Sequence, residues 1–283
     1  MIKILIVGLG LIGGSLAKAL VDFPNACVFG VDLDEATLKA SEDDGVIVKG
    51  YKNADDILAD ADIVFMCLTP EKTVNFINTK KFKSDALVTD VCGVKGYIFE
   101  NIKNTDIDFI GGHPMAGREV GGYESSQKTL YNGANYIVVK QETNKKEHVD
   151  YLEKIIKHIG CKHITYTTAE DHDEMIAYTS QLMHVVAATL CDNEILDRAE
   201  SYSAGSLRDC TRVAKLNPDM WSELFVENKD ALSEQIRILM YSLMKIDDYI
   251  KKGDKESIKK FLENTCKRKK RYLAEKEKYD RIE

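Results

Sequence analysis

The sequence predicts an α/β protein in two parts: a doubly wound domain with a mostly parallel sheet over residues 1–168, and an all-α domain over residues 169–283. Three observations predict this. A glycine-rich turn follows the first strand, strand and helix patterns alternate as far as Tyr166, and only helical patterns remain from Glu170 onward. Alternating strands and helices are typical of a parallel sheet with helices on both faces.

The first strand and its turn lie within residues 3–17, where a short apolar run over residues 4–7 precedes the glycines. Gly8, Gly10 and Gly13 stand in G-x-G-x-x-G spacing. In a dinucleotide-binding turn, these glycines permit the turn, the approach of a pyrophosphate and close packing of the helix. The helix then directs its free N–H groups at the phosphates. We predict a nucleotide site here; a glycine-rich turn without a ligand is the alternative.

The second strand, residues 27–31, ends at Asp32, about 20 residues beyond the last glycine of the turn, which is the spacing of the acid that binds the adenosine ribose. A carboxylate there accepts hydrogen bonds from two hydroxyls and repels a 2′-phosphate, so we expect NAD rather than NADP. The alternative is that Asp32 caps the next helix, a role that Asp34 could fill instead.

Further strands and helices follow in alternation. Strands are expected over residues 27–31, 63–68, 86–89, 109–112, 136–139 and 163–166, with helices over residues 11–21, 55–58 and 95–102, from residue 70, and up to residue 156. This is the Rossmann arrangement, in which ligands bind at the carboxyl ends of the strands. The residues expected at the cofactor are therefore Gly8, Gly10, Leu11, Ile12, Gly13, Asp32, Leu68, Thr69 and Asp90.

The most informative loop follows the strand at residues 109–112 and has the sequence H-P-M-A-G-R-E over residues 113–119. His113 stands at a strand's carboxyl end and is followed by a proline, so it is a candidate for acid–base chemistry. The residues alone leave open a loop histidine that only hydrogen-bonds a backbone group.

At this point the sequence resembles the prephenate dehydrogenases, oxidoreductases of tyrosine biosynthesis. The resemblance covers nearly the whole chain and is carried by G-L-G-L-I-G-G-S (8–15), T-D-V-C-G-V-K (89–95), H-P-M-A-G-x-E (113–119), Q-L-M-H (181–184), L-R-D-C-T-R-V-A (207–214) and Trp221. It implies an NAD-dependent oxidative decarboxylation of prephenate to 4-hydroxyphenylpyruvate.

The resemblance also implies roles for individual residues. His113 matches the family's catalytic histidine, and Glu119 lies near the entrance of the active site. The family usually has D-x-G-S-x-K, with a serine near the substrate hydroxyl and the nicotinamide. This chain has Cys92 and Gly93 instead. Gly93 has no hydroxyl, so that contact must come from water, backbone or another side chain.

The second half begins where Thr168 can cap a helix. Residues 182–191 are apolar almost all round, which is typical of a helix buried on every side. We therefore expect a homodimer in which a second subunit packs around this helix. His184 is the one strongly polar group in the stretch. A hydrogen-bonded core histidine is the alternative, but the resemblance implies a second active-site histidine that orients the substrate.

Arg208 and Arg212 are four residues apart, so we expect them on one helix face, with Asp209 pointing elsewhere. Arginines in this largely apolar segment need anionic partners; a solvated basic face is the alternative. The resemblance assigns them to a substrate carboxylate, with Arg212 the firmer assignment. Trp221, near the start of a long helix that begins at residue 217, is expected in the substrate pocket or in the core.

Composition excludes several classes of protein. The net charge of −7 argues against nucleic acid as a main partner. The apolar runs are too short to cross a bilayer, and the first strand begins too early to leave room for a signal peptide. The seven cysteines are scattered without a C-x-x-C pair, as expected of reduced thiols in a cytoplasmic protein. We expect no metal site.

Three alternatives remain open. Arogenate dehydrogenase differs only in an amino acid side chain on the substrate, and the sequence does not decide between the two substrates. A hydroxyacid dehydrogenase with a helical second domain would be expected to use a lysine base. A dinucleotide-sensing regulator without chemistry is disfavoured by the presence together of His113, His184 and Arg212, although Gly93 favours it slightly.

Overall fold

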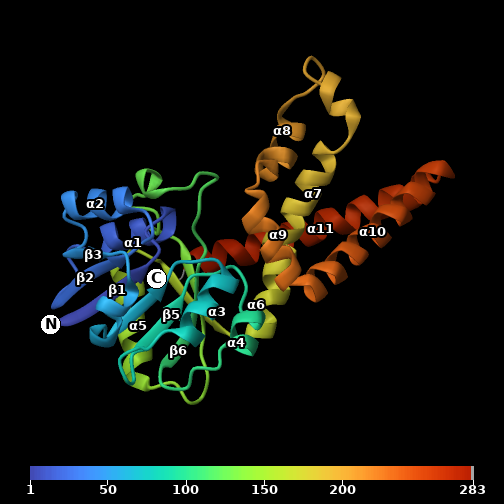
Figure 1. The fold of residues 1–283 in the computed structure, drawn as a ribbon. Coiled ribbons are helices and arrows are strands. Elements are labelled where there is room, and N and C mark those ends of the chain that lie inside the picture. The colour runs from blue at the N-terminus through green and yellow to red at the C-terminus, as the bar shows by residue number, and fades with distance from the viewer. Residues whose placement is uncertain (282–283) are drawn as a thin grey trace. The chain divides into compact units, whose positions relative to one another are not determined.

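The computed structural model describes residues 1–281 and has a mostly parallel eight-stranded sheet at its N-terminal side (Figure 1). The strand order is β3-β2-β1-β4-β5-β6-β7-β8. The strands are β1 (Ile2–Val7), β2 (Ala26–Val31), β3 (Lys49–Tyr51), β4 (Ile63–Met66), β5 (Leu87–Asp90), β6 (Asp108–Pro114), β7 (Asn135–Val139) and β8 (His163–Thr167). Neighbouring strands are parallel except β6 and β7, which run antiparallel. The predicted doubly wound sheet is confirmed.

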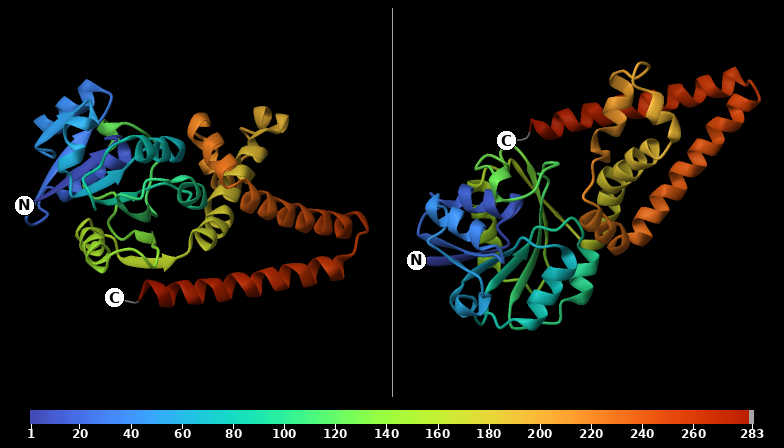
Figure 2. Two further views of the ribbon diagram at one scale, coloured as in Figure 1. Left: turned by 60° about the horizontal axis from the view of Figure 1, so that its bottom comes forward. Right: turned by 45° about the horizontal axis from the view of Figure 1, so that its top comes forward.

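Five helices cover the two faces of the sheet: α1 (Leu11–Leu20), α2 (Glu35–Asp43), α3 (Pro70–Thr79), α4 (Gly96–Asn101) and α5 (Lys146–His158) (Figures 1 and 2). Side chains alternate along β1, so Ile4 and Ile6 pack with α1, α2 and α5. Leu5 and Val7 pack on the opposite face with α3 and α4. Both faces are therefore buried, which explains the nearly continuous apolar runs of the central strands.

Two short segments differ from the prediction. The helix expected over residues 55–58 consists of two 3₁₀ turns, η1 (Ala54–Asp56) and η2 (Leu58–Asp60). Asn53 begins the first turn, with its side chain accepting a hydrogen bond from the N–H of Asp55. The edge strand β3 has three residues, too few for a periodic pattern, and its place follows from pairing with β2.

The helical region after β8 begins as predicted. The Thr168 hydroxyl accepts a hydrogen bond from the N–H of Asp171 and caps the next helix. The elements are α6 (Ala169–Ile176), the π-helical turn η4 (Ala177–Gln181), α7 (Leu182–Cys191), η5 (Glu194–Arg198), α8 (Gly205–Thr211), η6 (Arg212–Ala214) and α9 (Pro218–Glu227). A π-helical turn inside a helix is frequent at functional sites, and no sequence signal predicted this one.

The long helix expected from residue 217 is broken at Asn228, which lies between α9 and α10 (Lys229–Lys251). Asn228 is buried, and its side-chain amide donates to the carbonyl of Asp173 and to Oε1 of Gln181. The apolar residues at helical spacing, which include Trp221, Leu224, Phe225, Leu232 and Ile236, form an apolar stripe that continues across this position, so the periodicity gave no sign of the break. At the break, Asn228 is therefore hydrogen-bonded to α6 and to η4, which are 55 and 47 residues away in the sequence.

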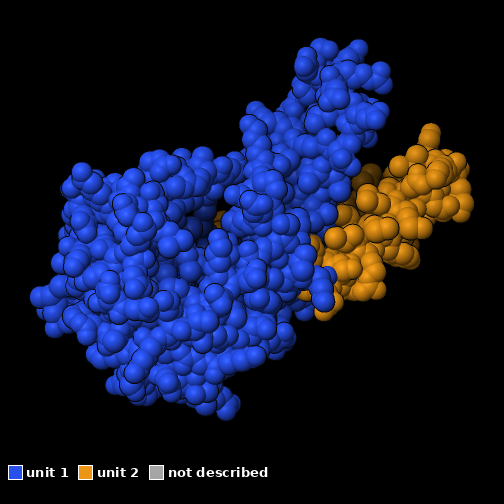
Figure 3. Space-filling view, viewed as in Figure 1, with its two compact units in different colours: residues 1–229 blue, residues 230–283 orange. Residues whose placement is uncertain are grey.

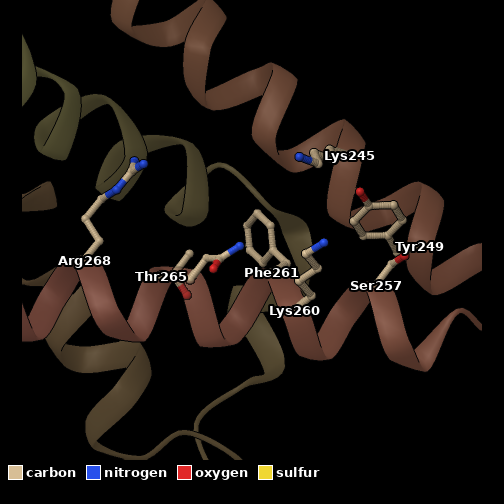
Figure 4. A pocket seen from close by; sticks show the side chains of 8 residues that line it. Lys245, Tyr249, Ser257, Lys260, Phe261, Thr265 and Arg268 are labelled. Atoms are coloured by element: carbon tan, nitrogen blue, oxygen red, sulfur yellow. The ribbon is translucent and has the colours of Figure 1, made fainter.

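The chain forms two compact units, Met1–Lys229 and Asp230–Glu283 (Figure 3). The second contains α10 and α11 (Lys255–Asp280), which diverge from the turn at residues 252–254 (Figure 2). A groove of about 490 Å³ lies between them, and Figure 4 shows Lys245 and Tyr249 on α10 and Phe261 and Arg268 on α11 at its walls. Among the described residues, none of the helices has the length and apolarity that a membrane span requires.

The apolar helix α7 is not buried on every side within a single chain. Only Leu182 and Ala187 are buried, whereas Met183 and Leu190 are 44% and 43% exposed.

Candidate active site

The glycine turn after β1 has the close contacts that its spacing predicts. Gly8 has a φ of +92°, and a Cβ there would lie 2.6 Å from the carbonyl oxygen of Cys67. A Cβ on Gly13 would lie 1.8 Å from the carbonyl oxygen of Gly8, so only glycine allows α1 to pack this close to the strand. No atom lies within 4 Å of where a Cβ of Gly10 would be, so that side of the turn is open.

Two kinds of polar group near the glycine turn are available to a ligand. Helix α1 begins at Leu11 and Ile12 without a side-chain cap, which leaves its first N–H groups available for an anion. Beside β1 in the sheet, β4 leads through Leu68 to Thr69, whose hydroxyl is buried and has no hydrogen-bond partner among the described residues. The strand order changes direction between β1 and β4, where nucleotides bind in such sheets. These residues fit a dinucleotide.

Asp32 follows β2, beside the turn. Its Oδ2 accepts the N–H of Leu9 at 2.8 Å, and its Oδ1 accepts the N–H of Asp34 at 3.0 Å. The alternative role of capping α2 belongs to Asp34, which accepts the N–H groups of Ala36 and Thr37. Asp32 is therefore free of the capping role and holds the glycine turn, with lone pairs left for a ribose.

Asp90 and Lys95 form a fully buried ion pair, with Nζ and Oδ2 2.6 Å apart. Lys95 also donates to the carbonyl oxygens of Cys92 and Val94, and Asp90 accepts the N–H groups of Cys92 and Gly112. Breaking one partner of such a pair is costly because the other charge stays buried. Asp90, predicted at the cofactor, is thus enclosed by protein donors, and it holds the loop after β5 against the end of β6.

His113 stands at the carboxyl end of β6, as predicted, and its ring meets a second histidine. Nδ1 of His113 lies 2.9 Å from Nε2 of His172, and Nδ1 of His172 lies 2.7 Å from Oδ1 of Asp173. Asp173 also accepts the N–H groups of Lys95 and Gly96 at 2.8 and 2.7 Å. The start of α6 therefore reaches both His113 and the first turn of α4.

His172 and Asp173 are absent from the residues predicted for the site. The only local signal is the adjacent H-D pair in the first helix after the sheet, and nothing in its spacing points to His113, 59 residues away. Packing of α6 against α4 brings them together.

Burial holds the pKa of His113 well below its ordinary value of 6.5, and the positive charge of Lys95 lowers the pKa further. Burial also lowers the pKa of His172, although its hydrogen bond to Asp173 opposes the shift. Both rings are therefore neutral at pH 7, the state that a general base requires.

Gly93 lies beside His113. A Cβ at Gly93 would be 3.8 Å from Cδ2 of Leu224 and 4.0 Å from Cε1 of His113, both ordinary contacts. The position therefore has room for a side chain next to the imidazole. Position 93 therefore lacks a hydroxyl because its residue is glycine, and not because there is no room for a side chain.

His184 and Trp221 stack on each other, with ring centroids 3.8 Å apart and planes inclined by 31°. Nδ1 of His184 donates to the carbonyl of Ser180 at 2.8 Å, within the π-helical turn. Burial lowers the pKa of His184, and the charge of Arg212 adds to that shift. Because Nδ1 is used internally, the neutral ring presents Nε2 as an acceptor.

Arg212 pairs with Glu119, with Nη1 and Oε1 2.9 Å apart. The expected shared helix face with Arg208 is wrong: α8 ends at Thr211, and Arg212 begins the 3₁₀ turn η6. Arg208 is exposed and pairs with Asp209 through Nε at 3.1 Å, so the expectation that Asp209 points elsewhere is also wrong. The structure thus brings Arg212 and Glu119 together and pairs Arg208 with its own neighbour.

Within residues 1–281, no group of three or more histidine, cysteine, aspartate or glutamate side chains is arranged to hold a metal ion.

Known proteins match this chain along most of its length. Residues 16–165 match the family model of the prephenate dehydrogenase nucleotide-binding domain, and residues 168–264 match that of the prephenate dehydrogenase dimerization domain. A prephenate dehydrogenase of Bacillus subtilis (strain 168) is 27% identical over 90% of this chain and 72% of its own length.

Two solved structures share the fold. Prephenate dehydrogenase from A. aeolicus, solved in complex with hydroxyphenyl propionate and NAD⁺, is 30% identical with a TM-score of 0.84 and covers 95% of this chain and 98% of that one. Synechocystis arogenate dehydrogenase is 27% identical with a TM-score of 0.79 and covers 96% of this chain and 100% of that one.

Proposed function

Because this chain belongs to the prephenate dehydrogenase family, we propose that it catalyses the NAD-dependent oxidative decarboxylation of prephenate to 4-hydroxyphenylpyruvate. The relative from A. aeolicus, solved with NAD⁺ and a hydroxyphenyl compound, supports the proposal. The observation that carries it within this chain is His113, a neutral imidazole at the carboxyl end of β6 beside the Gly93 loop.

Chemistry at the substrate follows from that placement. The substrate ring has a hydroxyl opposite a carboxylate. His113 accepts the hydroxyl proton as the hydroxyl-bearing carbon becomes a carbonyl carbon. The carboxylate then leaves as CO₂, the bonding electrons make the ring aromatic, and the protonated His113 returns a proton to the ring oxygen. A base with a lowered pKa stays unprotonated over a wide range of pH.

NAD, when bound, supplies the hydride acceptor. Gly8, Gly10 and the first turn of α1 would hold its phosphates, Asp32 its ribose, and Thr69 a polar atom near the end of β4. We assign the nucleotide-binding part to residues 1–168 and the helical part to residues 169–283.

The substrate contacts proposed are Arg212 for the side-chain carboxylate, and His184 and Trp221 for the orientation of the ring. Arg212 has a planar fork that can hold a carboxylate through two parallel hydrogen bonds. In the free protein the fork is occupied by Glu119, so binding exchanges one carboxylate for another. Arg208 is a weaker candidate because it pairs with its sequence neighbour Asp209, whereas Arg212 pairs with Glu119, in the loop that follows His113.

Arogenate is a second candidate substrate. The Synechocystis relative is an arogenate dehydrogenase, and the Glu119 carboxylate beside Arg212 could accept hydrogen bonds from the ammonium group of an amino acid side chain.

We also propose that the active form is a homodimer built through the helical domain. Residues 168–264 match a dimerization domain, and α7 and α10 expose large apolar side chains in a single chain. A reducing, cytoplasmic location fits the seven cysteines, which are free thiols.

The test is NADH formation by the purified protein with prephenate and with arogenate, each at saturating NAD. We expect turnover of prephenate, and His113→Asn is expected to lower kcat by roughly 10²–10⁴ while NAD binding persists. Turnover of arogenate but not of prephenate would show that arogenate is the substrate. Turnover of neither would refute the activity.

A further inference from the structure

Two hydrogen bonds join His113, His172 and Asp173, and in each of them the donor is on the side of His113 and the acceptor on the side of Asp173. The carboxylate of Asp173 can only accept, so Nδ1 of His172, 2.7 Å from Oδ1, must carry a proton. Because burial lowers the pKa of His172, the ring is neutral at pH 7, and its Nε2 carries no proton. Nε2 of His172 is therefore an acceptor.

That acceptor lies 2.9 Å from Nδ1 of His113. Two bare nitrogens cannot share a hydrogen bond, so Nδ1 of His113 must donate. The ring of His113 is neutral too, so it has one proton, and its lone pair is left on Nε2. Nε2 takes no part in the chain of contacts to Asp173.

We propose that His172 and Asp173 are positioning residues that fix the tautomer of His113, so that Nε2 is the atom that accepts the substrate's hydroxyl proton. The inference rests on the proposed function, because it assigns an atom to that reaction. When Nε2 takes the proton, both nitrogens of His113 are protonated. Nδ1–H remains on His172, and the carboxylate of Asp173 balances the new charge through the neutral ring between them.

The carboxylate of Asp173 also connects the two histidines to the rest of the site. Asp173 receives the N–H groups of Lys95 and Gly96, at the start of α4. The other charged groups near the two rings are Lys95 and Asp90, which neutralise each other at 2.6 Å. Asp173 is thus the carboxylate that is hydrogen-bonded to the histidine pair.

The tautomer can be measured without substrate. Two-bond ¹H–¹⁵N correlation spectra of protein labelled with ¹⁵N-histidine distinguish Nδ1–H from Nε2–H, and the chain has six histidines. His113→Asn and His172→Gln assign the two rings by loss of their signals. We expect Nδ1–H with a bare Nε2 for both rings at pH 7.5. An Nε2–H tautomer for His113 would overturn the inference, whatever the substrate proves to be.

Kinetics test the consequence for turnover. His172→Leu removes the acceptor, and kcat should fall roughly 10- to 150-fold, the usual contribution of a hydrogen bond to a charged group. KM for prephenate and Kd for NAD should stay within about threefold. His172→Gln places an amide oxygen where Nε2 was, so it should recover most of kcat. Unchanged kcat in His172→Leu, or no recovery with glutamine, would contradict the positioning role.

The matched control is His148→Leu. His148 and Asp108 form a second histidine–aspartate pair at the same distance, 2.7 Å, away from the candidate base. Loss of that pair should leave kcat and the His113 signals unchanged. An equal loss of kcat in this control would show that the effect of His172→Leu is one of general stability.

Discussion

At the residue scale, the substrate contact proposed for Arg212 would explain how an acidic chain binds an acidic substrate. The net charge of −7 repels a dianion at long range, so binding must come from cations placed in the pocket. Arg212 pairs with the carboxylate of Glu119, and it can exchange this partner for a carboxylate of the substrate. The side-chain carboxylate of the substrate does not react, so the contact proposed for Arg212 would be the same before and during the reaction.

Arg212→Ala should therefore raise KM for prephenate by a factor of roughly some tens and lower kcat much less. Steady-state kinetics at saturating NAD measure both. Arg208→Ala is the control and should change KM little, because Arg208 pairs with its own neighbour Asp209 and not with the loop that follows His113. An unchanged KM in Arg212→Ala would refute the assignment. A fall in kcat alone would place Arg212 at the departing carboxylate.

Asp32 carries the second prediction at this scale. We expect a strong preference for NAD, because a carboxylate at the end of β2 repels a 2′-phosphate. Asp32→Ala should weaken NAD binding and relax the preference, as measured by kcat/KM for NAD and NADP. Asp34→Ala removes the neighbouring carboxylate, which caps α2, and should leave the ratio unchanged. Comparable kcat/KM for NADP in the unmutated protein would contradict the prediction.

At the scale of elements, the end of α9 carries a carboxyl group with an unusual environment. Oε2 of Glu227 is buried without a hydrogen-bond partner among the described residues. Burial, together with the charges of Glu223, Glu71 and Asp173, raises the pKa of Glu227 to about 8. Glu223 accepts the N–H of Glu71, so α9 and the start of α3 present their acids at one place.

This environment predicts how stability depends on pH. Glu227 binds its proton more tightly in the folded state than in the unfolded state, where the pKa is near 4.5. Its contribution is therefore fully present below about pH 4.5 and is lost as pH rises through about 8. Urea unfolding at pH 5, 7 and 9 should show a fall in the free energy of unfolding that Glu227→Gln reduces. Glu263→Gln, at an exposed position of α11, should leave the fall as it is; equal slopes for Glu227→Gln and the unmutated protein would contradict the prediction.

At the scale of the whole molecule, the apolar side chains of α7 and α10 predict assembly. Light scattering at micromolar concentration should show a dimer, since a monomer would expose these side chains to water. Met244→Glu places a charge on α10, where the methionine is 68% exposed, and should weaken the dimer. Val48→Glu makes the same change at a 64% exposed position of the nucleotide-binding domain and should not. A monomer with full activity would rule out the assembly.

The sequence by itself determined the features that depend on neighbours along the chain. The strand, glycine turn and helix over residues 2–20 follow from apolar spacing and from the absence of side chains on Gly8 and Gly13. The caps at Asp34 and Thr168 follow from side chains that reach the next turn of their own helix. The position of His113 at a strand's carboxyl end likewise follows from the residues next to it in the sequence. Parallel packing then gathers such ends at one edge of the sheet.

Only the tertiary structure decided the features that join distant parts of the chain. His172 reaches His113 across 59 residues because α6 packs against α4, and Asn228 breaks a continuous apolar stripe because Asp173 and Gln181 accept its amide. Arg212 does not share the helix face of Arg208, because α8 ends at Thr211 and Arg212 begins the next turn. Periodicity along a helix does not encode such contacts. A buried polar group takes whichever partner packing supplies, since leaving it unpaired costs more than ending a helix.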